Sequence, residues 1–198
     1  IEVFLVGRSL HEMTNEELWQ LFPIILKPHD PAWCQQYKKE EERLLANLNE
    51  FKIIRISHIG STVVPDIYAK PTVDILMEVA KMNSTKRKAL IASLTQMGYL
   101  YSYQKHQAQP RMMFMKGYTP SGFAPEVFHL HVRYHKDWDE LYFCQYLITH
   151  PDVAKEYEEL KLSLKESFKH DRDGYTYAKT AFIKKWTKIA RLEANESL

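Results

Sequence analysis

The chain has 198 residues, of which 45% are hydrophobic and 13% aromatic, so it is long enough for one domain with a substantial core. Its formal charge of +2 at pH 7 is too small for a protein that binds nucleic acid mainly through charge. No apolar run reaches the roughly 18 residues that a membrane-spanning helix needs, and Cys34 and Cys144 are far apart in the sequence. We therefore expect buried free thiols, a cytoplasmic location, and no membrane or nucleic-acid partner. The sequence does not fix the oligomeric state.

The first half of the chain predicts helices alternating with two strands. Thr14 and Glu17 have the spacing of a capping box, so a short helix should begin there, within an N-terminal helical extension over residues 1–23. Strands are predicted from β-branched or continuous apolar runs, and helices from apolar residues three or four apart. The predicted elements are a helix over 14–21, a helix over 30–48 that Asp30 caps, strands over 51–56 and 73–79, and a helix from the cap Ser84 to Met97.

The second half changes character near Trp138. Three strands are predicted before it, over 99–103, 112–116 and 127–134, with the Pro- and Gly-rich stretch 117–125 as a hairpin-like connection. Three amphipathic helices are predicted after it, over 139–149, 151–168 and 175–193, with a turn at 171–174. Hairpin-length links outnumber helical crossovers, so the predicted class is α+β, with a mixed or antiparallel sheet of about five strands. No linker separates the sheet part (51–134) from the helices (138–195), so residues 24–198 are interpreted as one domain.

The most informative motif is the Gly-Ser turn Gly60-Ser61-Thr62, which follows the first predicted strand. Glycine lets backbone amides approach a phosphate closely, and the neighbouring hydroxyls can hold its oxygens. Asp74 begins the next strand and could bind a divalent metal between phosphate oxygens. This arrangement resembles the nucleotidyltransferase fold of the polymerase-β type. That pattern has a second acid two residues later, where this chain has Leu76, so the alternative is that Asp74 only holds the turn.

Two histidines alternate on the last predicted strand. Alternation puts His129 and His131 on one face with Arg133. Imidazoles at i and i+2 on a strand can share a metal, and Asp74 would complete a set of two histidines and one carboxylate. The expected cofactor is a divalent metal, Mg, Mn or Zn, and no organic cofactor is predicted. The alternative is a polar strand face that only contacts solvent.

Other candidates are titratable or cationic side chains near these motifs. His58 precedes the Gly-Ser turn and could act as a general acid or base. Lys70 precedes the Asp74 strand, and Arg111 and Lys116 flank the Met-rich strand, so each could neutralise phosphate charge. For each of these residues the alternative is a structural or solvated side chain. The Met-rich run itself is interpreted as core.

Taken together, these motifs resemble the GrpB family. The resemblance is carried, in chain order, by Pro28–Trp33, His58–Thr62, Val64-Pro65, Ala69–Pro71 with Asp74, Arg111–Gly117, His129–Val132, Tyr146-Leu147, His150-Pro151, Tyr157-Glu158, Leu160-Lys161, Tyr175, Lys179 and Phe182. Asp66 departs from it, since the family often has Gly there. The resemblance implies a nucleotidyltransferase-like α+β fold.

The leading functional hypothesis is metal-dependent binding or transfer chemistry on a small nucleotide or phosphorylated substrate. Asp74 and His58 would be catalytic, and Asp74 would also bind the metal with His129 and His131. The predicted phosphate- and nucleotide-binding residues are Gly60, Ser61, Thr62, Lys70, Arg111 and Lys116. The alternative is a non-catalytic nucleotide-binding module, or a protein- or RNA-interaction module, that keeps the fold but lacks the second carboxylate.

Overall fold

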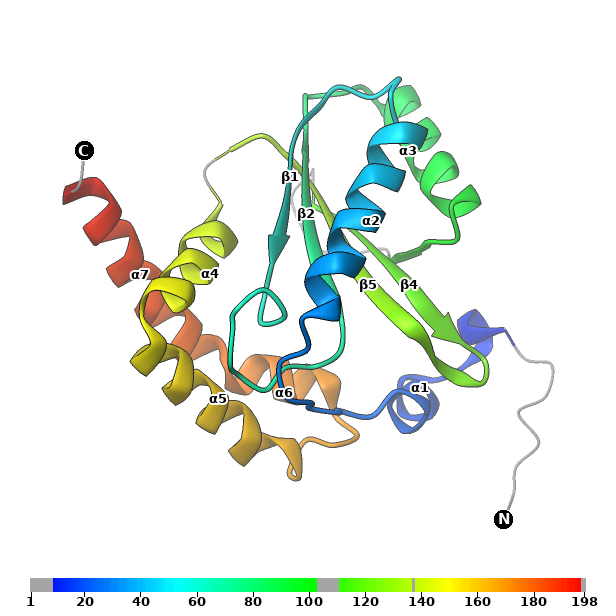
Figure 1. Ribbon diagram of the computed structural model, residues 1–198. Coiled ribbons are helices and arrows are strands. Elements are labelled where there is room, and N and C mark those ends of the chain that lie inside the picture. Colours follow the sequence, from blue (N-terminus) through cyan, green and yellow to red (C-terminus); the bar gives the residue numbers. More distant parts are fainter. Residues whose placement is uncertain (1–8, 103–110, 137, 197–198) are drawn as a thin grey trace, which may run out of the picture.

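The computed structural model describes residues 9–102, 111–136 and 138–196. They contain one five-stranded sheet with the strand order β1-β2-β5-β4-β3 (Figure 1). The strands are β1 (Ile53–Ile59), β2 (Val73–Val79), β3 (Leu100–Ser102), β4 (Met112–Thr119) and β5 (Gly122–Tyr134). The central strands β2 and β5 run parallel, and the other neighbours are antiparallel. The predicted α+β class with a mixed five-stranded sheet is confirmed.

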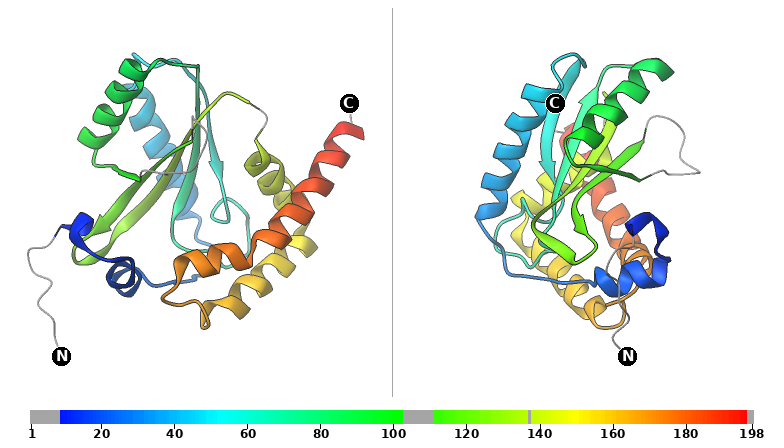
Figure 2. Two further views of the ribbon diagram at one scale, coloured as in Figure 1. Left: turned by 180° about the vertical axis from the view of Figure 1, so that it is seen from behind. Right: turned by 90° about the vertical axis from the view of Figure 1, so that its right-hand side faces the viewer.

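Most helices lie on one face of the sheet or along one side of it, and one short helix packs against the other face. They are α1 (Asn15–Leu21), α2 (Ala32–Asn47), α3 (Ser84–Gln96), α4 (Asp139–Thr149), α5 (Pro151–Lys165), α6 (Arg172–Ala178) and α7 (Thr180–Glu196), with a 3-10 turn at Leu10–Glu12. Helices α2 and α3 pack on the sheet, whereas α4 to α7 form an arm beside it with an apolar cluster of their own (Figure 2). In the described ranges, no helix is long and apolar enough to cross a membrane.

Alternation along β2 gives the sheet two unlike faces. Val73, Ile75 and Met77 point toward α2 and α3 and are completely buried in the main core, so we call this side the helix-covered face. Asp74 points to the other side, and the parallel register places it beside His129 of β5. We call this side, which carries Asp74, His129, His131 and Arg133, the polar face. Neighbouring strands thus bring together residues that are 55 positions apart.

Several predicted elements are confirmed closely. Strand β2 has the predicted bounds, and the capping box of α1 is formed, with Thr14 Oγ1 accepting from the Glu17 amide at 3.2 Å. Asp66 has a φ of 59°, which places it in the left-handed region. Glycine is favoured at such a position and aspartate is among the better-tolerated alternatives, which agrees with the glycine that the family resemblance implies there.

Other boundaries differ from the prediction for identifiable reasons. Strand β1 continues to Ile59, because its pairing with β2 continues that far. The stretch 117–125 is mostly strand, with β4 and β5 turning only between Thr119 and Gly122. Helix α3 is capped by Asn83, which accepts from the Lys86 amide, and not by Ser84.

Further differences concern the helical arm and the cysteines. The helix predicted from Tyr175 is two helices, α6 and α7, and the predicted turn at 171–174 is the start of α6, capped by Asp171. Both thiols are free, as expected, but only Cys144 is buried and Cys34 is exposed. Tyr103, the end of the predicted third strand, lies outside the described residues.

Candidate functional site

The Gly-Ser turn lies directly against Asp74. Gly60 follows the last residue of β1, has a φ of 76°, and a Cβ built on it would lie 2.6 Å from Asp74 Oδ2. Only glycine combines this backbone conformation with so close an approach. The amides of Ser61 and Thr62 donate to no acceptor among the residues that the structure describes. The turn therefore leaves two amide donors available near a carboxylate.

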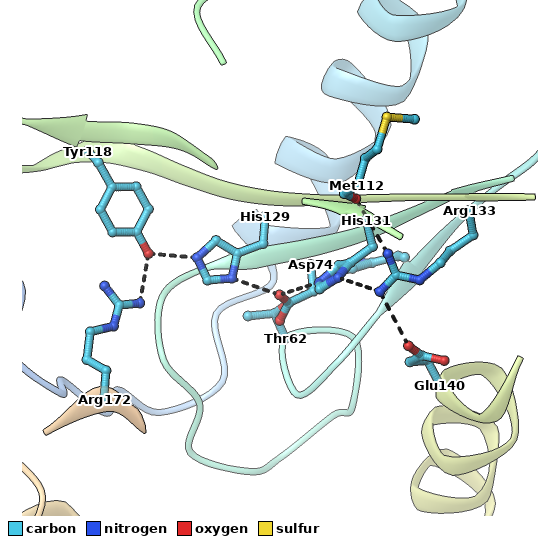
Figure 3. A network of polar contacts seen from close by, with 10 residues as sticks. Thr62, Asp74, Met112, Tyr118, His129, His131, Arg133, Glu140 and Arg172 are labelled. Atoms are coloured by element: carbon cyan, nitrogen blue, oxygen red, sulfur yellow. Dashed lines mark hydrogen bonds and ion pairs between the residues drawn. The ribbon is translucent and has the colours of Figure 1, made fainter. Parts of the chain in front are cut away.

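Asp74 is held by the histidines of β5 (Figure 3). Its Oδ1 lies 3.2 Å from His129 Nδ1 and 3.6 Å from His131 Nε2, and 27% of its side chain stays exposed. Burial alone would raise the pKa of this carboxyl, but the hydrogen bonds from the two imidazoles, and their charge when they are protonated, outweigh it and hold the pKa below its usual range. Asp74 is therefore ionised at neutral pH.

His129 is fixed from its other side by Tyr118 and Arg172. Its Nε2 lies 2.7 Å from the Tyr118 hydroxyl, which accepts from Arg172 Nη2 at 2.8 Å. Burial lowers the pKa of His129, so the ring is neutral at pH 7. One tautomer satisfies every partner: His129 Nδ1–H donates to Asp74, and Nε2 accepts from Tyr118. The result is a continuous chain of hydrogen bonds from Arg172 to Asp74.

A β-bulge at Gly117 brings Tyr118 into this chain. The register between β4 and β5 shifts between Lys116 and Tyr118. Gly117 has a φ of 88°, and a Cβ there would lie 2.2 Å from the Glu126 carbonyl oxygen. Without the bulge Tyr118 would point to the same face as Lys116, because strand side chains alternate. With it, the Tyr118 ring stacks against His129 on the polar face.

The three predicted metal ligands lie together but do not surround a common point. Within the described ranges, no group of three His, Cys, Asp or Glu side chains could hold a metal ion. His129 and His131 both turn a ring nitrogen toward Asp74 Oδ1, and His129 uses an N–H there. A metal ligand must instead present a lone pair. The predicted centre of two histidines and one carboxylate is therefore not preformed.

Three lysines from separate segments gather around the turn. Lys70 precedes β2, Lys161 lies on α5, and Lys179 lies between α6 and α7. Lys161 and Lys179 are only 2% and 9% exposed. Burial, assisted by repulsion from neighbouring cations, lowers the pKa of Lys161 and of Lys179 to about 7 and that of Lys70 to about 8. We call these three residues the lysine cluster.

Among the described residues, the charges of Asp74 and Glu158 act on the lysine cluster, but neither carboxylate forms an ion pair with it. Lys161 donates to the Tyr68 carbonyl, and Lys179 Nζ lies 4.2 Å from the centroid of the Tyr175 ring. Among the residues described, neither Lys70 nor Lys179 forms an ion pair with a carboxylate. Buried charge without a counter-charge is unfavourable, so this arrangement is typical of a site that receives an anion.

A cavity of about 190 Å³ joins the turn to the lysine cluster. Its lining includes the turn residues 60–62, Asp74, all three lysines and Tyr157. Tyr157 shares a hydrogen bond with the Ser61 side chain. We call it the phosphate cavity, after the ligand that its donors fit. A second cavity of about 710 Å³ adjoins it, and Lys70 and Thr176 line both.

His58 lies outside the phosphate cavity, behind the turn. Its register partner is Ile75, so its side chain is on the helix-covered face. The ring stacks on Tyr37 with 4.8 Å between centroids, and Nε2 lies 2.9 Å from the hydroxyl of Thr62, a residue only 1% exposed. Burial lowers the pKa of His58 to about 4. His58 therefore contacts the turn through Thr62, and its ring lies outside the phosphate cavity in which the predicted acid–base role would be needed.

Arg111 and Lys116 are not brought to the phosphate cavity. Lys116 pairs in register with Phe128, which places its side chain on the helix-covered face, where Nζ forms an ion pair with Glu40 at 2.8 Å. Arg111 lies at the far end of the polar face, with its guanidinium 5.4 Å from the centroid of the Trp138 ring. Neither residue lines the phosphate cavity where phosphate binding was predicted: strand register turns Lys116 to the helix-covered face, and Arg111, just before β4, lies beside Trp138.

The site also contains cations to which the sequence analysis assigned no role. The sequence singles out Lys161 and Lys179 only through the family resemblance, and it places Arg172 only within the predicted turn at 171–174. Lys161 and Lys179 each follow a tyrosine by four residues, and each ammonium lies over that tyrosine's ring, Tyr157 or Tyr175. This repeated Tyr-x-x-x-Lys spacing is the sequence signal that could have pointed to both lysines. It places a lysine on the apolar side of a helical turn, where a ring covers it.

Comparison with known proteins gives one consistent family. Residues 23–189 match the model of the family described as GrpB protein. The chain is 36% identical to a UPF0157 protein of Pseudomonas aeruginosa over 157 residues, which cover 79% of this chain and 63% of that relative. It is 32% identical over 163 residues to the glutamate-rich protein GrpB of Alkalihalophilus pseudofirmus, covering 81% and 91% of the two chains. The chain thus spans less than two thirds of the Pseudomonas relative.

A solved structure agrees with these sequence matches. The crystal structure of the conserved protein GrpB from Enterococcus faecalis superposes on this chain with a TM-score of 0.74 at 30% identity. The superposition covers 86% of this chain and 99% of that one.

Proposed function

This chain belongs to the GrpB family, and we propose that it binds the phosphate chain of a small nucleotide or related phosphorylated compound. The observation that carries the proposal is the lysine cluster around the Gly-Ser turn, in which Lys161 and Lys179 are buried and, among the described residues, no lysine forms an ion pair with a carboxylate. A phosphate chain carries several negative charges and many acceptor oxygens. Lysine ammonium groups and free backbone amides are the donors that bind such oxygens in proteins.

Asp74 gives this site a place for a divalent cation that accompanies the phosphates. Mg²⁺ is usually bound through one or two carboxylates plus substrate phosphates, and not by a complete cage of protein ligands. One ionised carboxylate at the edge of the phosphate cavity fits that mode, and a metal held there would offset the repulsion between Asp74 and the phosphates. The divalent-metal prediction is therefore kept in this narrower form, with Asp74 as the protein ligand.

A specific observation favours binding without transfer as the alternative. Leu76 occupies the position of the second acid and is completely buried with Ile59 and Trp138. A carboxylate could not replace it there without losing those apolar contacts. In addition, both nitrogens of His129 are already engaged, by Asp74 and Tyr118. These observations support phosphate binding and leave few free groups for moving protons.

The test is calorimetric titration of Asp74→Asn with ATP, with and without Mg²⁺. With Mg²⁺ we expect binding to weaken at least roughly ten-fold, since a charged ligand group is worth on the order of 1.5–3 kcal/mol. Without metal the same variant should bind ATP more tightly than the wild type, because a negative charge beside the phosphates has been removed. The matched control is Asp139→Asn, whose carboxylate pairs with Arg191 away from the site.

Two outcomes separate the possible functions. Equal affinity of Asp74→Asn and the wild type under both conditions, with unchanged circular dichroism, would refute the proposed site. Incubation of the wild type with ATP and Mg²⁺ or Mn²⁺, followed by analysis for pyrophosphate, then distinguishes transfer from binding. Intact bound ATP favours the binding module, and released pyrophosphate favours transfer.

A further inference from the structure

We infer that the cavity of about 710 Å³ receives the nucleobase of a nucleoside polyphosphate, and that helix α1 decides which base is accepted. The inference rests on the proposed function, because it assigns the rest of the same ligand. We call this cavity the α1 cavity. Its volume lies within the range of roughly 300–1,000 Å³ that small-molecule sites occupy.

The walls of the α1 cavity suit a flat apolar group. The side chains of Trp19 and Phe22 contribute aromatic surface, and Met113 and Met115 form part of the sheet side. Nucleobases bind proteins largely by stacking on aromatic rings. A few polar groups, Asn15 among them, also line the cavity and could contact the edge of a base. An inorganic phosphate chain has nothing to place against such walls.

The two cavities meet at the Asp74–His129 contact. Asp74 lines the phosphate cavity and His129 lines the α1 cavity, and the two side chains are joined at 3.2 Å. Lys70 lines both cavities, and Arg172 adds a second cation to the α1 cavity. A ligand whose phosphates lie among the lysines would therefore extend past His129 into the α1 cavity. This charge distribution fixes the direction of the ligand, with its anionic end toward the lysine cluster.

Helix α1 is held in place as a wall on both of its sides. His170, in the α5–α6 connection, lies 3.1 Å from the Trp19 carbonyl oxygen through Nδ1. Phe22, directly after the helix, packs edge-on against Tyr118 with 4.8 Å between centroids and against Phe123 at 5.0 Å. The wall is thus anchored both to the helical arm and to the β4–β5 hairpin. Residues 9–23 of the predicted N-terminal extension are packed against the domain.

We assign the specificity role to α1 because this helix lies outside the residues that match the family model. The family model matches residues 23–189, which include every residue that lines the phosphate cavity. Helix α1 ends at Leu21, before that match begins. The phosphate cavity therefore belongs to the shared family core, while one wall of the α1 cavity is supplied from outside it. We expect this arrangement when family members share the phosphate site but differ in the base that they select.

The experiment titrates the full chain with ATP, GTP, CTP, UTP and inorganic tripolyphosphate, each with Mg²⁺. For the wild type we expect at least one nucleotide to bind roughly ten-fold more tightly than tripolyphosphate, which is a modest stacking contribution. Trp19→Ala should remove this advantage and leave tripolyphosphate affinity within about two-fold. Gln20→Ala is the matched control, because Gln20 is exposed on the same helix and does not line the cavity. Trp19→Leu, which keeps an apolar side chain there, repeats the test if Trp19→Ala does not fold.

The possible results separate this inference from the function on which it rests. Failure of the wild type to bind tripolyphosphate would refute the proposed function and this inference with it. Tripolyphosphate binding with no tighter nucleotide would overturn the inference alone. So would a nucleotide advantage that persists in the folded Trp19 variants. Loss of the advantage in those variants but not in Gln20→Ala would establish α1 as the specificity element.

Discussion

The helix-covered face of the sheet and the lysine cluster both bury charged side chains, but they balance them differently. On the helix-covered face Glu40 is 4% exposed and accepts from Lys116 at 2.8 Å, from the Tyr99 hydroxyl at 2.8 Å and from Arg43 at 3.0 Å. In the lysine cluster Lys179 is 9% exposed, and its ammonium lies over the Tyr175 ring and forms no ion pair with a carboxylate of the described residues. A charge balanced within the protein stabilises the fold. A charge left unbalanced raises the energy of the empty protein and is useful only when a ligand supplies the counter-charge.

The largest expected difference between the helix-covered face and the lysine cluster is in the pH dependence of stability. Lys161 and Lys179 have folded-state pKa values of about 7, below the roughly 10.4 of an unfolded lysine. Between these values the unfolded chain binds more protons than the folded one, so stability must rise with pH. The two lysines repel each other, so loss of about one proton from pH 7 to pH 9 should stabilise the ligand-free protein by about 2–3 kcal/mol.

Urea unfolding at pH 7, 8 and 9 measures this rise directly. Lys179→Met should flatten it, because the variant removes one of the two cations, whereas Lys116→Met should leave its slope unchanged. A stability that stays constant or falls over this range in the wild type would mean that the lysine cluster is balanced by groups within the protein.

The next expected effect compares the stabilities of two lysine variants, one at Lys116 on the helix-covered face and one at Lys179 in the lysine cluster. Lys116→Met should destabilise the protein by about 2 kcal/mol, because Glu40 then keeps only two of its donors in a buried position. Lys179→Met should be neutral or stabilising at pH 7, since it removes a buried cation without orphaning a carboxylate. Thermal and urea unfolding of the two variants test the contrast. Equal destabilisation by the two variants would contradict the distinction between the helix-covered face and the lysine cluster.

A smaller difference is expected between two glycines with positive φ. Gly60 and Gly98 have φ of 76° and 88°, but only Gly60 has the Asp74 carboxylate in the path of a new Cβ, since nothing lies within 4 Å at Gly98. Gly98→Ala should cost about 1 kcal/mol from backbone strain alone. Gly60→Ala should cost about 1 kcal/mol more, because the carboxylate must move. If the two variants unfold at the same urea concentration, the turn does not press on Asp74.

Local patterns were sufficient to predict much of the fold. The apolar run of β2 and the capping box of α1 depend on neighbouring residues, and both were predicted with the observed bounds. The helix predicted from Tyr175 failed at Lys179, where two helices meet, because helical periodicity continues across the junction and hides the break. The β4–β5 hairpin was predicted too short because Gly and Pro within 117–125 mark a bulge and an edge as well as a turn.

Which residues come together at the site depends on strand register, and a single sequence does not provide that register. Asp74, His129 and His131 were grouped correctly, because all three alternate onto one face. His58 and Lys116 were placed with them, but their partners, Ile75 and Phe128, lie on the other face. The Tyr-x-x-x-Lys spacing indicates that a ring covers Lys161 and Lys179, but their arrival at one cavity depends on how the helical arm folds back against the sheet, which that spacing does not encode.

The most direct test of the central claim is calorimetric titration of the protein with inorganic tripolyphosphate at pH 7.5, in two buffers of different ionisation enthalpy. Bound phosphate should raise the pKa of the lysine cluster, so we predict binding with net proton uptake. Affinity should be at least roughly ten-fold weaker in Lys179→Met and unchanged in Lys116→Met. Absence of binding, or equal affinity in Lys179→Met and the wild type, would contradict the account.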